Sequence, residues 1–451
     1  MALQTLAVFL CFAAACLPLT LCENWALLVA GSNGYYNYRH QADICHAYHI
    51  VRSHGIPQEN IVTMMYDDIA YNEENPIRGN IINQPDGPNV YPGVVIDYKK
   101  EEVTPAVFLA VLSGNEKKVK ELTGHDGKVI KSGPDDHVFV NFADHGAPGL
   151  LAFPDQMLYA RKLMSTIKKM YRKKSYKKMV FYVEACESGS MFYNLLPDDI
   201  NVYASTAANR SQSSYACYYD SKRETYLGDV YSVNWMQDSD KEDLQTETLQ
   251  KQFSITKDET NTSQVREYGD MTISQMTVAE FQGDEAADVR SIPFYHPVED
   301  AVPAREAIFH ILDKKMVNAG TQQQRRDAAQ KISDLMEHNA QVDELFKGIV
   351  EWLSRKVGVT RWSDNVLRFD AEQTYSAVQN ERRDISQWEC YEHVLDTLIS
   401  ACPKLKLTQD YYAMGQLYML VNLCEQGHPT YSVATAVRYA SLRNPLLCAL
   451  G

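Results

Sequence analysis

Between residues 25 and 290, short apolar segments of strand length alternate with amphipathic segments of helix length. WALLVAG (25–31), HVFVNFADHG (137–146) and MVFYVEAC (179–186) are apolar, and the amphipathic YRHQADICHAYHIVRSHG (38–55) follows the first of them. Strands that are almost continuously apolar are buried on both faces, which is typical of a parallel sheet covered by helices on each side. We therefore predict an α/β fold with a mostly parallel sheet for this part of the chain.

After residue 300 the sequence pattern is that of helices alone. Segment 327–358 has apolar residues at helical spacing. The join at 313–329 is polar and basic, as expected of an exposed linker. We predict an α/β domain at 23–290, a linker at 291–325 and an all-α domain at 326–451.

The first 22 residues form a separate segment. They contain the short apolar run LAVFLCFAAACLPLTLC, which Glu23 follows directly. This length suits a secretory signal peptide better than a membrane span, so we predict that segment 1–22 directs the chain into the secretory pathway. No later run approaches the ~20 apolar residues that a membrane span needs.

The cysteines fit an exported protein. The helical part contains four of them, Cys390, Cys402, Cys424 and Cys448. An even set confined to one region of an exported chain predicts two disulfides, and spacing alone leaves three pairings open. Cys45, Cys186 and Cys217 remain as thiols, and two sequons make Asn209 and Asn261 candidate glycosylation sites.

Charge divides unevenly along the chain. The net charge of −14 leaves no surplus of lysine and arginine to neutralise phosphates, which excludes a nucleic-acid-binding function. Residues 319–451 contain 14 basic and 16 acidic residues, a net charge of −2. The first 318 residues therefore carry a net charge of −12.

One cysteine stands where a buried strand is predicted to end. Cys186 follows the apolar run Met179 to Val183 and lies between Glu184 and Glu187. Free cysteines are usually buried as small apolar side chains. In an α/β sheet, however, ligands bind beyond the carboxyl ends of the strands, so Cys186 is placed as a nucleophile would be.

His145 is the best candidate for the base that Cys186 needs. A thiol is a weak nucleophile until a neighbouring base removes its proton, and histidine is the usual base. His145 follows the apolar run Val138 to Phe142 and precedes Gly146. If the two strands lie side by side, both side chains reach one edge of the sheet, where backbone N–H groups can face a developing oxyanion.

Four stretches of the sequence resemble the legumain family of asparaginyl endopeptidases. They are SNGYYNYRHQADICHAY (32–48), ADHGAPGLLAFP (143–154), VEACESGSM (183–191) and SSYACYYDSKRETYLGD (213–229). The resemblance covers nearly the whole chain after residue 22. It implies a caspase-like catalytic domain followed by a helical, disulfide-linked inhibitory prodomain. It also implies that Cys390 pairs with Cys424 and Cys402 with Cys448.

The resemblance assigns a role to each candidate catalytic residue. It implies that Cys186 is the nucleophile and that His145 is the general base and acid. The backbone amides of Gly146 and Cys186 would form the oxyanion hole, and Asn37 would position His145.

The resemblance also implies a pocket for the side chain that precedes the cleaved bond. Its residues are Arg39, His40, Glu184, Ser214 and Asp229. An asparagine carboxamide has one acceptor oxygen and two donor hydrogens. Arg39 can donate to the oxygen while Glu184 and Asp229 accept from the amide hydrogens. We therefore expect asparagine to be preferred near pH 6 and aspartate to be admitted as the pH falls. In the alternative interpretation, Arg39 and Asp229 form only a structural ion pair.

The sequence gives no reason to expect a metal or another cofactor. His40, His46, His49 and His54 crowd one segment, but they fall on different faces of a helix and have no second cluster at zinc-ligand spacing. The expected partners are peptide substrates, the chain's own prodomain and, by family resemblance, cystatin-type inhibitors. The resemblance implies a lysosome or another acidic compartment, or secretion into an acidic lumen.

Rival functions use the same residues. A peptide ligase would pass the acyl group from Cys186 to an amine instead of water. A transamidase that attaches lipid anchors would normally carry a C-terminal membrane span, whereas this sequence ends in NPLLCALG. A non-catalytic binding protein would not need all of the catalytic residues.

The linker contains a residue that such an enzyme would cut after. Asn318 lies in the polar stretch KKMVNAG. We therefore expect an inactive zymogen that cuts its own linker in acid. We also expect the carboxylates that hold the prodomain to have lowered pKa values, so that their contribution is lost as the pH falls.

Overall fold

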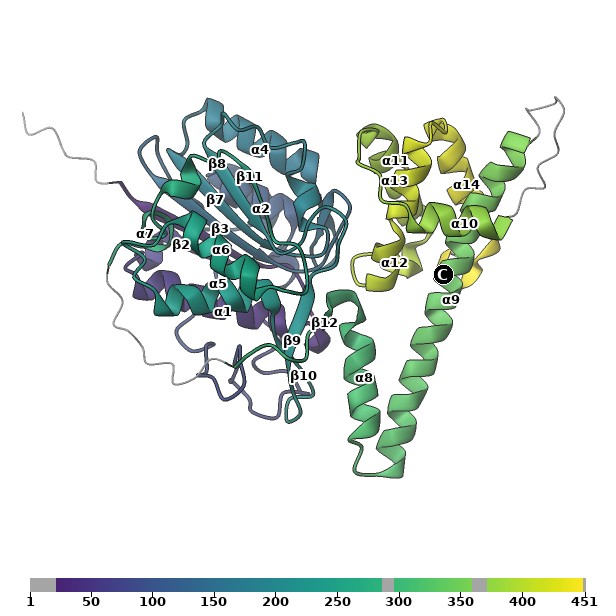
Figure 1. Ribbon diagram of the computed structural model, residues 1–451, viewed down its shortest axis with the longest axis horizontal. Helices are drawn as coiled ribbons and strands as arrows, with labels where there is room; N and C mark the ends of the chain where they lie inside the picture. The colour runs from purple at the N-terminus through teal and green to yellow at the C-terminus, as the bar shows by residue number, and fades with distance from the viewer. Residues whose placement is uncertain (1–21, 286–295, 359–370, 449–451) are drawn as a thin grey trace, which may run out of the picture.

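A computed structural model describes residues 22–285, 296–358 and 371–448. An α/β domain and a helical domain lie side by side, and a long helical hairpin projects from the region between them (Figure 1). Residues 1–21, which include most of the predicted signal peptide, lie outside the described residues, as does the predicted boundary at 290. Among the described residues, no helix is both long and apolar enough to cross a membrane.

The α/β domain is built on a six-stranded sheet. In spatial order its strands are β11 (Arg266–Gly269), β8 (Val202–Thr206), β7 (Lys178–Glu184), β3 (His137–Ala143), β1 (Asn24–Ala30) and β2 (Ile61–Met64). All neighbouring pairs are parallel except β11 with β8. The expected mostly parallel sheet is therefore confirmed.

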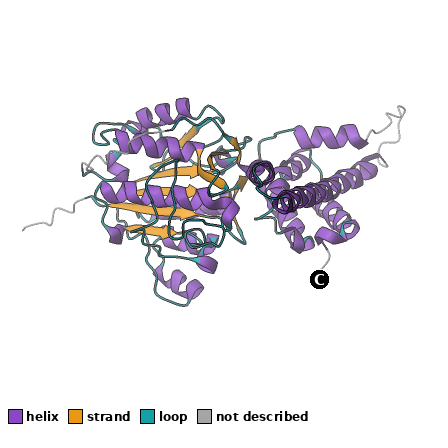
Figure 2. Ribbon diagram, turned by 90° about the horizontal axis from the view of Figure 1, so that it is seen from below, coloured by secondary structure: helices purple, strands orange, loops and turns teal. Residues whose placement is uncertain are grey.

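Helices cover both faces of this sheet (Figure 2). One face packs against α1 (Tyr38–Ser53), α5 (Val230–Lys241), α6 (Leu249–Glu259) and α7 (Ala279–Gln282). The other packs against α2 (Pro105–Leu112), α3 (Glu116–Thr123) and α4 (Ala160–Arg172). Along β1 the side chains alternate between the two cores, so almost every residue of the strand is apolar.

Two small antiparallel sheets extend the domain where the main strands end. One contains β10 (Thr225–Asp229), β9 (Tyr215–Asp220) and β12 (Val302–Pro303). The other contains β4 (Gly146–Ala147), β5 (Leu150–Ala152) and β6 (Met157–Tyr159). β12 belongs to the linker, so the linker adds a strand to the α/β domain.

The C-terminal domain is helical, as expected. Its helices are α9 (Gln322–Gly358), α10 (Ala371–Asn380), α11 (Trp388–Ala401), α12 (Tyr411–Gln416), α13 (Tyr418–Glu425), α14 (Thr430–Arg443) and α15 (Pro445–Cys448). Cys390 is bonded to Cys424 and Cys402 to Cys448, the pairing that the resemblance implies. Both disulfides lie within this domain.

The predicted linker is more ordered than its composition suggests. It forms η6 (Ala304–Glu306) and α8 (Ala307–Val317), and α9 begins at Gln322. Asn318 is exposed in the turn between α8 and α9. These two helices form the projecting hairpin in Figure 1. Ile311 and Leu312 are buried, so the apolar face of α8 explains why this segment is helical.

Candidate active site

The register of two neighbouring strands brings His145 and Cys186 together. β3 and β7 are parallel, and Ala143 is paired with Glu184 at the end of the ladder. The Asp144 amide then donates to the Glu184 carbonyl oxygen at 3.0 Å. His145 and Cys186 each lie two residues beyond that last pair, so both leave the sheet at the same edge.

The His145 ring is oriented by Asn37. Nε2 of His145 lies 2.9 Å from Oδ1 of Asn37, whose amide nitrogen donates to the Asn33 carbonyl oxygen at 2.9 Å. Because Oδ1 can only accept, Nε2 carries the ring proton. Nδ1 is buried and has no hydrogen-bond partner within the described protein, which leaves a lone pair available to a thiol. Burial lowers the pKa of His145 well below its usual range, so the ring is neutral.

The surroundings of Cys186 are tightly packed. Its Sγ lies 3.2 Å from Oγ of Ser213 and 3.6 Å from Oγ of Ser214. A Cβ atom at Gly146 would collide with the Cys186 carbonyl oxygen, so only glycine allows the two chain segments to approach this closely. Gly146 therefore fixes the distance between the two loops that carry His145 and Cys186.

A cluster of buried polar side chains, called the candidate pocket from here on, adjoins the two candidate catalytic residues. Arg39 donates from Nε to Oδ1 of Asp229 at 2.8 Å, and each side chain is 1% exposed. Glu184 accepts through one oxygen from the backbone and hydroxyl of Ser232, at 2.9 and 3.0 Å. Nη2 of Arg39, Oε1 of Glu184 and Oδ2 of Asp229 are buried without a hydrogen-bond partner. One donor and one acceptor are thus free to bind a polar ligand, and the second acceptor, Oδ2 of Asp229, lies 3.5 Å from Nε2 of His40.

His40 connects the pocket to His145. Its Nε2 lies 3.5 Å from Oδ2 of Asp229, and its Nδ1 is hydrogen-bonded to Oγ of Ser32 at 2.7 Å. The His40 and His145 rings meet edge to face with centroids 5.0 Å apart. Burial, followed by the charge of Arg39, lowers the pKa of His40 well below its usual range. The His40 side chain is therefore uncharged and borders the pocket.

Burial also changes the pKa values of the two acidic residues in the pocket. It raises the pKa of Glu184 well above the usual value, and the neighbouring Asp229 carboxylate raises it further. Burial raises the pKa of Asp229 as well, although Arg39 opposes this effect. These carboxyl groups therefore gain protons at a higher pH than exposed acids do.

His40, Asp144 and His145 form the one group of described residues whose ligand atoms lie close enough for a metal ion, within 4.8 Å of one another. His145 Nε2 and His40 Nδ1 already have Asn37 and Ser32 as partners. His46, His49 and His54 bond elsewhere in the fold. We assign no metal site to these residues.

Two residues that sequence reasoning missed reach this site, one from the helical domain and one from the linker. The Tyr411 ring, at the start of α12, stacks on His145 with centroids 3.6 Å apart, and Asn37 donates to its hydroxyl at 2.5 Å. Arg305, in η6, donates to the Gly146 carbonyl oxygen at 2.7 Å and pairs with Glu187. No local pattern marks either residue, because each reaches the site only through the docking of the C-terminal part.

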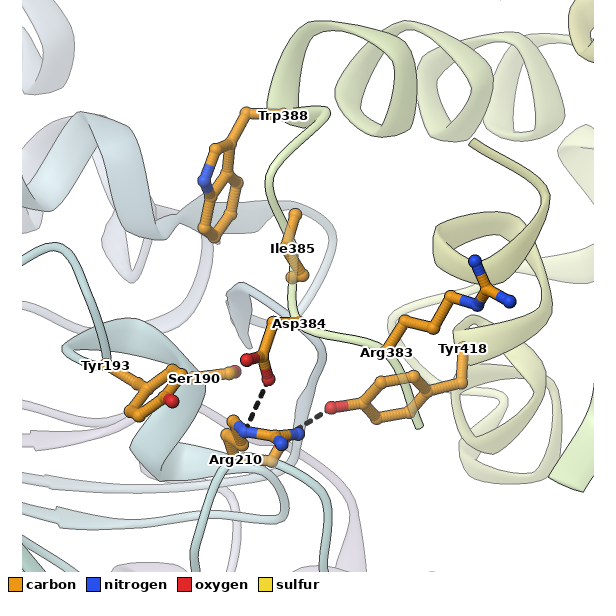
Figure 3. A pocket seen from close by; sticks show the side chains of 8 residues that line it. All are labelled: Ser190, Tyr193, Arg210, Arg383, Asp384, Ile385, Trp388 and Tyr418. Atoms are coloured by element: carbon orange, nitrogen blue, oxygen red, sulfur yellow. Dashed lines mark hydrogen bonds and ion pairs between the residues drawn. The ribbon is translucent and has the colours of Figure 1, made fainter. Parts of the chain in front are cut away.

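Contacts around a small pocket hold the two domains together (Figure 3). Arg210 forms an ion pair with Asp384 at 2.7 Å, and its carbonyl oxygen accepts from the Tyr418 hydroxyl at 2.5 Å. The ring of Trp388 lies beside Gly149, which has a positive φ and no room for a side chain. The candidate glycosylation residue Asn209 precedes Arg210 and is only half-buried.

Comparisons with known proteins agree with this geometry. Residues 24–284 match the model of the Peptidase C13 family, and residues 330–441 match the model described as the legumain prodomain. The chain therefore belongs to the Peptidase C13 family of cysteine peptidases. Its two-part architecture is that of a prolegumain, in which the peptidase domain is followed by the prodomain.

Curated relatives match the chain over most of its length. It is 46% identical to legumain of Homo sapiens over 93% of both chains, and 48% identical to legumain of Bos taurus over 90% of both. It is 41% identical to a hemoglobinase of Schistosoma japonicum over 92% of both chains.

Proposed function

We propose that this cysteine endopeptidase cleaves peptide bonds after asparagine and, in stronger acid, after aspartate. The observation that carries the proposal is the set of unpaired buried atoms in the pocket: Nη2 of Arg39, Oε1 of Glu184 and Oδ2 of Asp229. An asparagine side chain needs one donor and two acceptors, which these three atoms supply. A pocket built to hydrogen-bond a ligand rejects side chains that leave its polar atoms unpaired.

The proposed chemistry uses the neutral state of His145. Its Nδ1 takes the proton of the Cys186 thiol, and the sulfur adds to the carbonyl carbon that follows the bound asparagine side chain. The imidazolium then gives the proton to the departing amine, and water releases the acid from the thioester. Asn37 acts as a positioning residue, because its hydrogen bond keeps the proton on Nε2.

The preference between asparagine and aspartate should depend on pH. Near pH 6 a substrate aspartate is ionised and repels the pocket acids, but protonation removes that repulsion. Since burial raises the pKa values of Glu184 and Asp229, their protonation begins above the usual range and helps to admit aspartate. The ratio of kcat/KM for the Asp peptide to that for the matched Asn peptide should rise at least tenfold between about pH 6 and about pH 4.

The measurement is a pH series on two peptides that differ only at the residue before the cleaved bond. A Gln peptide serves as the control, because it has the same amide group on a longer side chain. Equal cleavage of Asn and Gln peptides, or a ratio that does not change with pH, would refute the proposed pocket. An added peptide amine reports ligation in the same assay.

We further propose that the prodomain keeps the enzyme inactive until acid releases it. Tyr411 covers the face of His145, and Arg305 lies across Gly146 and Glu187, so substrate has no access while both are in place. Secretion and delivery to an acidic compartment fit this scheme. Asn318 is the proposed processing site, because it is an exposed asparagine in a turn.

The predicted pKa change of the interface carboxylates is wrong for two of them. Burial raises the pKa of Glu187, although Arg305 opposes it, and burial raises that of Glu392. A carboxyl group whose pKa is raised by docking takes up a proton on docking, so by linkage it favours the docked state as the pH falls. These two groups therefore do not drive release.

Release in acid is instead supported by a more exposed contact and by overall charge. Arg210 of the peptidase domain pairs with Asp384 of the helical domain through a carboxylate that is about half exposed. Because an exposed pair of this kind contributes only about 0–1 kcal/mol, it holds the two domains together weakly. Acid removes negative charge from both domains and leaves them positively charged, so they repel each other.

Asn318→Ala should slow maturation. At about pH 4 the purified wild-type zymogen should shorten to a fragment that ends at Asn318, and the variant should do so at least tenfold more slowly or at another residue. Intact mass and C-terminal sequencing identify the ends. The control is Asn380→Ala, which removes an asparagine of α10. A wild-type fragment that ends far from 318, or full activity of uncut protein at neutral pH, would contradict the scheme.

A further inference from the structure

The linker runs along the edge of β9 as an added strand. Val302 pairs with Ala216 and Pro303 with Tyr215 in an antiparallel register. The register continues for one residue, because the Ala304 amide donates to the Ser214 carbonyl oxygen at 2.9 Å. Binding by addition of a strand to a sheet edge is a common way for an extended peptide to be recognised.

The strand ends beside the nucleophile. Oγ of Ser214, the residue opposite Ala304, lies 3.6 Å from Sγ of Cys186. The next linker residue, Arg305, bonds to the Gly146 carbonyl oxygen and to the carboxylate of Glu187, which follows Cys186 in sequence. The Ala304–Arg305 peptide bond therefore joins a residue whose backbone is paired with Ser214 to a residue whose side chain reaches Gly146. Ser214 and Gly146 both lie beside Cys186.

We propose that residues 302–305 are bound as a substrate would be, with Ala304 in the position of the residue before the cleaved bond. This inference rests on the proposed function. Ala304 is 3% exposed, but its methyl group has no polar atom. It cannot satisfy Nη2 of Arg39, Oε1 of Glu184 or Oδ2 of Asp229, which remain unpaired. The linker thus occupies the cleft but is not cleaved there, because residue 304 is alanine and not asparagine.

The same register defines a binding subsite for the residue that directly follows the cleaved bond. Arg305 is only 16% exposed there, and two of its nitrogens bond to the two carboxylate oxygens of Glu187. A bidentate pair of this kind fits a guanidinium group closely. Once the linker has left, Glu187 is free to bind a basic side chain directly after the cleaved bond. The preferred substrates are therefore peptides with asparagine followed by arginine or lysine.

Ala304→Asn should turn the linker into a substrate of its own active site. The Cys186 sulfur would add to the carbonyl carbon of residue 304, and the amine of Arg305 would leave with the proton from His145. Water would then hydrolyse the thioester, giving a carboxylate at 304 and a free amine at 305. Intact mass should show a cut between 304 and 305 in acid that is absent from the wild-type chain.

Two controls identify where this cut is made. Ala304→Gln places the same amide one methylene too far, so it should be cut at least tenfold more slowly. The cut in Ala304→Asn should follow first-order kinetics with a rate independent of protein concentration. Adding mature wild-type enzyme to a Cys186→Ser, Ala304→Asn chain should not cut position 304 while Asn318 is still uncut, because that linker is buried in its own cleft.

Stacking of Tyr411 on His145 is a second obstacle to cleavage in the zymogen, because it blocks proton transfer. A further variant removes this obstacle. The Ala304→Asn, Tyr411→Ala chain removes that ring. If neither chain is cut at 304 while mature wild-type enzyme cleaves an Asn peptide, the proposed binding mode is wrong. A cut that accelerates with protein concentration also overturns it. If the mature enzyme does not cleave after asparagine, the proposed function fails and this inference fails with it.

Peptides test the subsite after the cleaved bond separately. Mature wild-type enzyme should cleave an Asn-Arg peptide at least fivefold faster, in kcat/KM, than the matched Asn-Glu peptide at about pH 6. Glu187→Gln should reduce that ratio. Equal rates with the wild-type enzyme, or an unchanged ratio in the variant, would overturn the role of Glu187.

Discussion

Cys186→Ser should abolish cleavage after asparagine, and His145→Ala should lower kcat by about 10²–10⁴-fold. The hydroxyl of serine is a much weaker acid than a thiol, and a neutral imidazole cannot activate it as readily. Without His145 the thiol loses the buried Nδ1 that stands ready to accept its proton. The measurement is kcat on an Asn peptide with prodomain-free enzyme.

Loss of activity has meaning only if the fold survives. Cys186→Ser changes one atom, so its thermal unfolding should match that of the wild type. Cys217→Ser is the matched control, because Cys217 is also a buried thiol but lies in β9, outside the proposed chemistry. More than a few per cent of wild-type kcat in Cys186→Ser, or equal losses in both serine variants, would refute the assignment.

Arg39→Ala should cause the second largest loss. Removing a charged donor from a buried hydrogen bond costs about 1.5–3 kcal/mol, or roughly 10–150-fold in kcat/KM for an Asn peptide. The loss should appear mainly in KM if the bond forms equally in the bound substrate and the transition state. Cleavage of the Asn peptide should be compared with that of the Gln and Asp peptides.

The same substitution also tests whether Arg39 and Asp229 are only a structural pair. Removing one member of a buried ion pair destabilises a fold by about 3–5 kcal/mol, because the other charge is left unpaired. Arg39→Lys keeps the charge but not the second nitrogen donor, so it should restore stability better than it restores cleavage. Recovery of both to the same extent would support the purely structural interpretation.

Much of the α/β domain could be predicted from its sequence, because each of its features is local. The continuous apolar runs at β1, β3 and β7 identify strands that are buried on both faces. His145 and Cys186 both follow such runs, and parallel strands must end at a common edge. The roles of Asn37 and of the pocket residues came from the resemblance, because nothing in their spacing reveals their contacts.

Other features depend on docking and so escaped sequence reasoning. Segment 313–329 is mostly helical despite its polar composition. Tyr411 and Arg305 reach the site from distant parts of the chain, and the raised pKa of Glu187 follows from its burial in the folded protein.

Two parts of the chain cover the site: Tyr411 in the helical domain and residues 302–305 in the linker. Asn318 lies between them in sequence, in the turn between α8 and α9. While the linker is intact, the tether keeps Tyr411 near His145 at an effective concentration in the millimolar range. A cut after Asn318 converts this contact into an ordinary bimolecular equilibrium, so dilution favours loss of the helical domain with both its disulfides. Residues 302–305 are not diluted, because they stay covalently attached to the peptidase domain. If residues 302–305 bind as proposed, one cut yields a half-opened intermediate, and full activity requires that strand β12 also leave the cleft or be trimmed.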